Sequence, residues 1–300
     1  MKDFHVNRIL IPTDFSETGL LAIEHGTFMA KLFRAELHLL HVLEVNEYSF
    51  DIPEPILRFS NLEAVQGIAA KKMEDTAEGI YKESGIKPVA LCTTGKIARE
   101  VVDYADENKI DLIIMGTHGA SGFEEYFIGS NAHKIVNQAN CPVISVQTHA
   151  KKLGFTNIVL PIDDAIHSRQ KVDYAIELAK KYTSKIHILG LLETTEDNEE
   201  GKFNIKIDAV EEAIKKAGLP LSRKIIKGDH LAAEALKYSK EINADLIVIM
   251  TDHESKLTGM YMGPFAKQIV NHSRIPVMSI RPHEGLMSSN NPAGSPSLNG

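Results

Sequence analysis

The sequence is poor in the residues that stabilise small secreted proteins and membrane spans. It has 300 residues but only 2 cysteines and no tryptophan, which excludes a disulfide scaffold and favours reduced thiols. No run of about 18 apolar residues is present, and Met1–His5 contains no apolar signal core. We therefore expect a soluble, cytoplasmic protein without a membrane partner.

An excess of basic charge is also missing. The formal net charge is −7, with acidic and basic residues interspersed, so no basic stripe marks a nucleic-acid interface. Any anion site must then be local. The sequence also lacks a Walker A lysine, a nucleophile elbow, a zinc-spaced His/Cys cluster and a dinucleotide fingerprint. We therefore assign no catalytic and no metal-binding residue.

The chain does contain a glycine-rich stretch between a predicted strand and a predicted helix. Gly116-Thr117-His118-Gly119 is followed by nine residues and then by Gly129-Ser130. We expect these glycines to adopt positive φ and to let the backbone approach a ligand. The helix that follows offers unpaired N–H groups and the positive end of its dipole. This spacing predicts a phosphate-binding loop.

The chain also repeats itself. With a shift of 134 positions, Asp111–Ile113 aligns with Asp245–Ile247; with a shift of 149, Ile9–Asp14 aligns with Ile158–Asp163. Periods of this size indicate domain duplication. We predict one domain over residues 1–150, a second over 151–284, and a disordered tail over 285–300, which is rich in Ser, Asn, Pro and Gly.

In each half, short apolar runs alternate with longer helical patterns, which predicts a doubly wound α/β fold with a parallel sheet. In the first half the predicted strands are 8–12, 36–42, 88–92, 111–115 and 142–147, and the predicted helices are 17–33, 57–83, 98–108 and 130–139. In the second half the predicted strands lie near 157–160, 185–191, 223–226, 245–250 and 277–281. This half is shorter by about fifteen residues, around a predicted polar loop at 193–202.

Four segments resemble a known family. Pro12-Thr13-Asp14-Phe15-Ser16, His41-Val42, the Gly116–Ser130 motif and the closing Asn140–Val146 are similar to the nucleotide-binding members of the universal stress protein family. The similarity covers residues 6–148 and, more weakly, 155–282, so the chain resembles a tandem member. The resemblance implies five-stranded, Rossmann-like or flavodoxin-like domains with strand order 3-2-1-4-5. It also implies ATP at the carboxyl edge of the sheet and pairing through the fifth strand.

This topology places the site where the strand order reverses, at the carboxyl ends of the first and fourth strands. We expect the glycines and Ser130 to hold phosphate, and Val42 to offer backbone groups to the base. Asp14 is expected to accept hydrogen bonds from the ribose or adenine, or to help position Mg²⁺. The predicted binding residues are Pro12, Thr13, Asp14, Val42, Met115, Gly116, His118, Gly119, Gly129, Ser130 and Asn131.

Some of these residues have a structural alternative. Asp14 could simply cap the helix that starts near Ser16, and Ser130 could be only an N-cap. Gly119 could serve only as a turn residue. His118 either touches a phosphate oxygen or is solvated.

The second half departs from the motif where phosphate would bind. Gly116 aligns with Met250, Gly119 with His253 and Ser130 with Pro264, so side chains replace bare backbone and a helix-start N–H is lost. We expect this half not to bind ATP in the same way. The simplest role for it is structural: its fifth strand pairs with that of the first half in an internal pseudo-dimer. Because Pro161 and Asp163 are retained, binding of a different small ligand there stays open as an alternative. Two chains could also associate as a homodimer.

The function that these features predict is nucleotide-responsive regulation. ATP in the first domain would order the loop at 120–128 and so change the surface that an unidentified protein partner meets. Two alternatives stay open. One is a slow Mg-dependent ATPase or adenylate-transferring enzyme, and the other is a scaffold or small-ligand-binding protein that binds no nucleotide.

Overall fold

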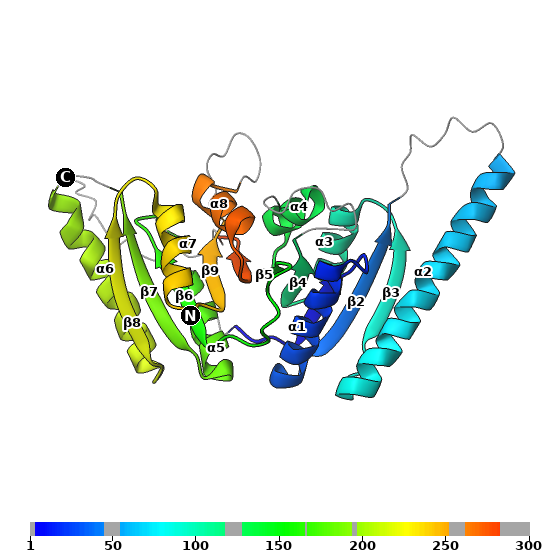
Figure 1. Cartoon of the computed structure of the whole chain (residues 1–300), viewed down its shortest axis with the longest axis horizontal. Helices are drawn as coiled ribbons and strands as arrows, with labels where there is room; N and C mark the ends of the chain where they lie inside the picture. The colour runs from blue at the N-terminus through cyan, green and yellow to red at the C-terminus, as the bar shows by residue number, and fades with distance from the viewer. Residues whose placement is uncertain are drawn as a thin grey trace, which may run out of the picture.

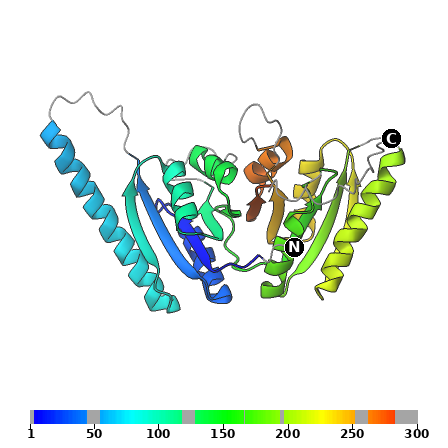
Figure 2. The same ribbon diagram turned by 180° about the vertical axis from the view of Figure 1, so that it is seen from behind.

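The computed structural model describes residues 4–44, 55–117, 128–165, 167–193, 197–251 and 262–282, with side chains except at 55–62 and 197–199. The tail at 285–300 and the loop at 120–127 lie outside these residues, as do His118, Gly119 and His253. The described part forms two α/β domains that share one sheet (Figures 1 and 2).

The first domain has the predicted alternation of strands and helices. Helix α1 begins at Glu17 because the Ser16 hydroxyl accepts a hydrogen bond from the Gly19 N–H at 3.2 Å. The elements are β1 (Arg8–Pro12), α1 (Glu17–Phe33), β2 (Glu36–Leu43), α2 (Pro55–Ser84), β3 (Val89–Thr94), α3 (Ile97–Glu107), β4 (Leu112–Gly116), α4 (Ser130–Gln138) and β5 (Val143–Val146).

The second domain repeats this order. Its elements are β6 (Asn157–Ile162), α5 (Lys171–Tyr182), β7 (Lys185–Leu192), α6 (Asp197–Lys216), β8 (Leu221–Lys227), α7 (Leu231–Glu241), β9 (Leu246–Met250), α8 (Pro264–His272) and β10 (Val277–Ile280). The predicted polar loop at 193–202 is wrong from Asp197 onward, because α6 already begins there. The signal was the apolar spacing of Phe203, Ile207, Val210 and Ile214, all of which are buried.

Ten strands form a single sheet in the order β3-β2-β1-β4-β5-β10-β9-β6-β7-β8. All pairs within a domain are parallel, and each domain has the order 3-2-1-4-5 that was predicted. The domains join through β5 and β10, which run antiparallel with Ile144 opposite Met278. The predicted pairing of the two fifth strands is therefore present, and it covers one edge of each domain's sheet.

Helices cover both faces of this sheet (Figure 1). In β1, Ile9 and Ile11 pack on the face that carries α1, α2, α5 and α6, whereas Leu10 packs on the face that carries α3, α4, α7 and α8. Residues of both domains belong to each of these two apolar clusters. The core is therefore continuous across the junction of β5 and β10.

None of the helices within the described ranges combines the length and the apolarity needed to cross a bilayer. Both cysteines, Cys92 and Cys141, are free thiols and half-buried.

Candidate functional site

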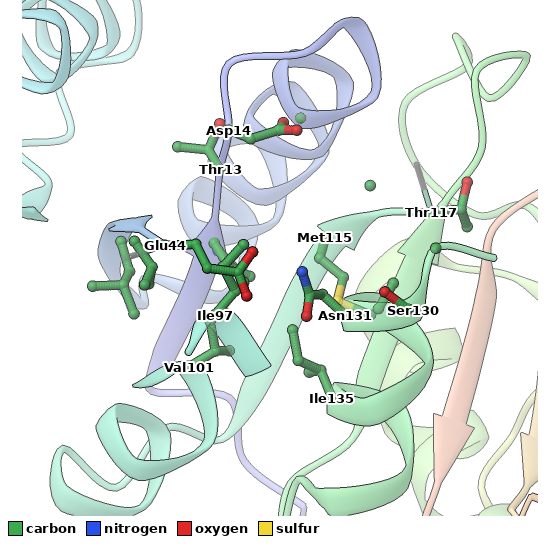
Figure 3. A pocket seen from close by; sticks show the side chains of 17 residues that line it. Thr13, Asp14, Glu44, Ile97, Val101, Met115, Thr117, Ser130, Asn131 and Ile135 are labelled. Carbon is green, nitrogen blue, oxygen red and sulfur yellow. The ribbon is translucent and has the colours of Figure 1, made fainter. Parts of the chain in front are cut away.

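A cavity of about 310 Å³ opens in the first domain at the carboxyl ends of β1 and β4 (Figure 3). Strand order reverses between these two strands, which is where doubly wound sheets bind their ligands. The volume is at the lower end of the range for small-molecule sites. The lining residues are Pro12, Thr13, Asp14, Gly19, Leu40, Val42, Glu44, Ile97, Val101, Met115, Gly116, Thr117, Gly129, Ser130, Asn131, Ala132 and Ile135.

Nine of the eleven binding residues predicted from the sequence line this cavity. They are Pro12, Thr13, Asp14, Val42, Met115, Gly116, Gly129, Ser130 and Asn131. The other two, His118 and Gly119, lie outside the described residues. The structure thus brings together segments about 100 residues apart in the chain, and their contact with a ligand stays a prediction.

Asp14 lies in the turn between β1 and α1. Its Oδ1 accepts hydrogen bonds from the Ser16 N–H at 3.0 Å and from the Ser16 hydroxyl at 2.5 Å. Ser16, not Asp14, is the N-cap of α1. Asp14 is exposed and lines the cavity, so its carboxylate both shapes the turn and faces the space a ligand would fill.

Thr13 is held in place from β2. Its N–H donates to the Leu40 carbonyl at 2.9 Å, and its own carbonyl lies 2.7 Å from His41 Nδ1. Because a carbonyl oxygen only accepts, Nδ1 carries the proton. The His41 ring also packs on Phe15, 4.9 Å between centroids. His41 therefore has a structural role: it holds the Thr13 carbonyl and packs on Phe15.

Gly116 ends β4 at the edge of the cavity. A Cβ at this position would lie 2.7 Å from the Thr18 Oγ1, 2.8 Å from its Cβ and 2.9 Å from its carbonyl carbon. Glycine is therefore required here by the close packing of α1 on β4. The expected positive φ is wrong for Gly116, as it is for Gly129, whose φ is −57°. The glycines provide room for close approach rather than a left-handed backbone.

The first turn of α4 borders the cavity. Gly129 is its N-cap and supplies no side-chain hydrogen bond, and the first turn contains no acidic residue. The first N–H groups of a helix have no partner within the helix, and they carry the positive end of its dipole. Ser130, Asn131 and Ala132 all line the cavity. This side can therefore hold an anion.

The opposite side of the cavity combines carboxylates with apolar side chains (Figure 3). Glu44, directly after β2, is exposed and joins Asp14 on the lining, and Ile97 and Val101 of α3 form an apolar wall. Glu44, Ile97 and Val101 were not predicted from the sequence, and neither were Gly19, Leu40, Thr117, Ala132 and Ile135. A usable signal was the spacing of Ile97 and Val101, which places both on one face of α3.

In the second domain, larger side chains occupy the aligned positions. Met250 stands in place of Gly116 and is only 4% exposed, and Pro264 is the first residue of α8, in place of Ser130. The helix beside this position also differs between the domains. In the first domain α1 begins at Glu17, whereas in the second α5 begins only at Lys171, which aligns with Ala22.

The turn after β6 is closed by polar contacts. The Asp163 N–H donates to the Ser168 hydroxyl at 3.1 Å, and Lys206 Nζ donates to the Asp164 carbonyl at 2.6 Å and to its carboxylate at 2.9 Å. Ser168 aligns with Gly19 of the first domain. This turn is therefore built differently from the turn between β1 and α1 that borders the cavity of the first domain.

Comparison with known proteins gives a consistent result. The model of the universal stress protein family matches residues 5–147 and again residues 154–281. The universal stress proteins MJ0531 and MJ0577 of Methanocaldococcus jannaschii are 34% and 32% identical to this chain over 152 residues. These matches span 48% and 47% of this chain and 84% and 94% of those proteins.

The fold is also found in a solved structure. A universal stress protein from Archaeoglobus fulgidus DSM 4304 superposes with a TM-score of 0.76 at 22% identity, over 93% of this chain and 99% of that one. At this identity the likeness shows the fold alone. It extends over both domains.

Proposed function

Because the chain belongs to the universal stress protein family, we propose that its first domain, residues 1–150, binds ATP or a related adenine nucleotide. Binding regulates the contacts of the protein with a partner. The residues at 151–284 form the second domain and serve as its structural counterpart. The cytoplasm is the expected location.

One observation carries this proposal. The uncapped first turn of α4 and the apolar wall of Ile97 and Val101 line the same cavity. A nucleotide needs both, because its phosphates require N–H donors and its base requires an apolar slot. A cavity for a simple anion would not need the apolar wall.

The residues divide by chemistry. The backbone N–H groups of Ser130 and Asn131 are proposed to hold phosphate, with Gly116 and Gly129 leaving room for its approach and His118 and Gly119 completing the loop. Val42 offers backbone groups to the base, and Pro12, Thr13 and Met115 border it. The carboxylates of Asp14 and Glu44 accept hydrogen bonds from ribose hydroxyls.

Magnesium enters this proposal only with the nucleotide. Within the described ranges no three His, Cys, Asp or Glu side chains are grouped so that they could hold a metal ion. Mg²⁺ prefers a few carboxylates together with phosphate oxygens and water. Orienting such a complex is the alternative role for Asp14, in place of the hydrogen bond to ribose.

A slow Mg-dependent ATPase is the second candidate, because two carboxylates line the cavity and one of them, Asp14, has an oxygen already directed by Ser16. Phosphate release from Mg-ATP distinguishes the two functions. A binding module gives release at the background rate. Turnover well above background that Asp14→Ala abolishes would show an enzyme.

The proposal is tested by calorimetric titration of the full chain with ATP, together with mass spectrometry of small molecules that copurify with it. We expect one nucleotide per chain. If no heat is released and no nucleotide copurifies, the chain is a scaffold or binds another small ligand. Two nucleotides per chain would show that the second domain binds as well.

A further inference from the structure

Helix α4, whose first turn borders the cavity, is held at both ends by side chains of the second domain. Before its first turn, the Ile128 N–H donates to Asn271 Oδ1 at 3.1 Å. At its other end, Arg281 Nη1 donates to the carbonyl of Gln138, the last residue of the helix, and to Asn140 Oδ1, both at 3.1 Å. These contacts join residues more than a hundred positions apart in the chain.

We propose that Asn271 is a positioning residue for the phosphate end of the cavity, so that the second domain sets the nucleotide affinity of the first. The proposal rests on the nucleotide binding proposed above. Its structural part, the hold on Ile128, is measurable without nucleotide.

Two successive amides immediately before α4 are both hydrogen-bonded. The Ile128 N–H bonds to Asn271, and the next N–H, that of Gly129, donates to the Thr117 carbonyl at 2.8 Å. The two bonds fix two neighbouring peptide planes immediately before Ser130. They therefore fix the direction in which the chain enters α4 and the direction of its first free N–H groups.

The acceptor is itself on a rigid element. Asn271 lies in the last turn of α8, directly after Ile269 and Val270, which are 0% and 1% exposed. A side chain carried by a helix packed on the core places its oxygen more accurately than one on a loop. The second domain thus supplies a fixed point to the segment that precedes the phosphate cradle.

The aligned asparagine of the first domain makes a different contact. Asn137 aligns with Asn271, but its Nδ2 lies 3.2 Å from Nδ1 of His133 in its own helix. The amide nitrogen only donates, so His133 accepts there. Asn137 is therefore engaged inside the first domain, whereas Asn271 reaches across to it.

Three variants of the full chain test the proposal. Asn271→Ala removes the acceptor, Asn271→Asp keeps an oxygen acceptor, and Gln268→Ala truncates an exposed amide side chain on the same helix. The measurements are hydrogen exchange of amides 128–132 without nucleotide and ATP affinity by calorimetry. The loss of one hydrogen bond should raise exchange in Asn271→Ala, and weaken ATP binding, by about two- to tenfold.

Asn271→Asp should keep the Ile128 amide protected, and Gln268→Ala should change neither measurement. Unchanged exchange at 128–132 in Asn271→Ala would overturn the proposal, as would faster exchange with unchanged ATP affinity. If the wild-type chain binds no nucleotide, the proposed function fails, while the exchange data still decide whether Asn271 holds Ile128. Asn271→Leu, which keeps the volume without an acceptor, replaces the alanine variant if that one does not fold.

Discussion

In both domains an aspartate that precedes the fourth strand holds the start of the first strand. The Oδ2 of Asp111 accepts from the N–H groups of Asn7 and Arg8 at 2.8 and 3.0 Å. The Oδ2 of Asp245 accepts from those of Thr156 and Asn157 at the same two distances. The scaffold contact at the amino edge of the sheet is therefore the same in the two domains.

At the carboxyl edge the two domains differ. In the first domain Thr18 packs so closely on Gly116 that no side chain fits there, whereas in the second domain the buried Met250 occupies the aligned position. Ser130 opens α4, whereas Pro264 opens α8. The duplicated chain has kept the contacts that hold the sheet together and has changed those that border the cavity, which is where a difference in ligand binding would arise.

The largest effect in this comparison is expected from Met250→Ala. The side chain is 4% exposed within the apolar core of the second domain, so its removal should lower the free energy of unfolding by about 2–5 kcal/mol. Urea unfolding followed by far-UV circular dichroism measures this. A loss under about 1 kcal/mol would mean that the aligned crevice is open, as in the first domain.

The reverse change in the first domain is Gly116→Ala. The added methyl group would lie 2.7–2.9 Å from Thr18, so we expect a loss of about 1–3 kcal/mol in the free energy of unfolding without nucleotide. Gly129→Ala is the control, because its nearest neighbour, the Thr117 carbonyl, would be 3.3 Å away and its φ is −57°. Equal losses in both variants would contradict the packing explanation.

Ser130→Pro places the residue of the second domain into the first. Proline is accepted at the first position of a helix, and Gly129, with φ −57° and ψ 150°, already has the extended backbone that a residue before proline needs. Stability should therefore change little. ATP affinity should fall about five- to hundredfold, because one N–H donor and one hydroxyl are lost.

Calorimetric titration of Ser130→Pro with ATP measures this effect. Pro264→Ser is the control, and it should bind ATP as the wild type does. If Ser130→Pro binds ATP normally, the first turn of α4 does not hold phosphate. If Pro264→Ser gains a second nucleotide site, the proline alone had closed the second crevice.

Much of the architecture was predictable from the sequence because it depends on local patterns. The alternation of elements and the bounds of β1 and α1 follow from short apolar runs, helix periodicity and the Ser16 cap. The strand order does not follow from these patterns; it was expected only because the chain resembles a known family. The start of α6 was missed because its polar first residues were given more weight than the apolar spacing that begins at Phe203.

The cavity was predictable only in part. Residues next to a motif, such as Asp14 and Ser130, were found. Ile97 and Val101 were not, because their spacing indicates an apolar face of α3 but not that tertiary packing brings this face to the cavity. Asn271 could not be found at all from the sequence, since its contact with Ile128 depends on how the two domains pair.

A last difference between the domains concerns a histidine on the second strand of each. His187 is 6% exposed; its Nε2 lies 3.1 Å from Asn157 Oδ1 and its Nδ1 lies 2.8 Å from the Ser222 hydroxyl. Burial, assisted by the Lys185 cation, lowers the pKa of His187 to about 4. In the first domain Glu36 takes the place of Lys185, with its carboxylate 3.6 Å from His38 Nε2.

The sign of the pH effect follows from that lowered pKa. Between about pH 6.5 and pH 4 the unfolded chain binds a proton at His187 that the folded chain does not. The neutral ring therefore contributes fully to stability above about pH 6.5, and this contribution is lost as the pH falls toward 4.

Lys185→Glu introduces the residue of the first domain and should raise the pKa of His187. The variant should therefore lose less stability than the wild type between pH 7 and 4.5, by about 1 kcal/mol after solvent screening. Urea unfolding at the two pH values and NMR titration of the ring measure this. A wild-type His187 that titrates near pH 6.5 would show that burial at this strand does not favour the neutral ring.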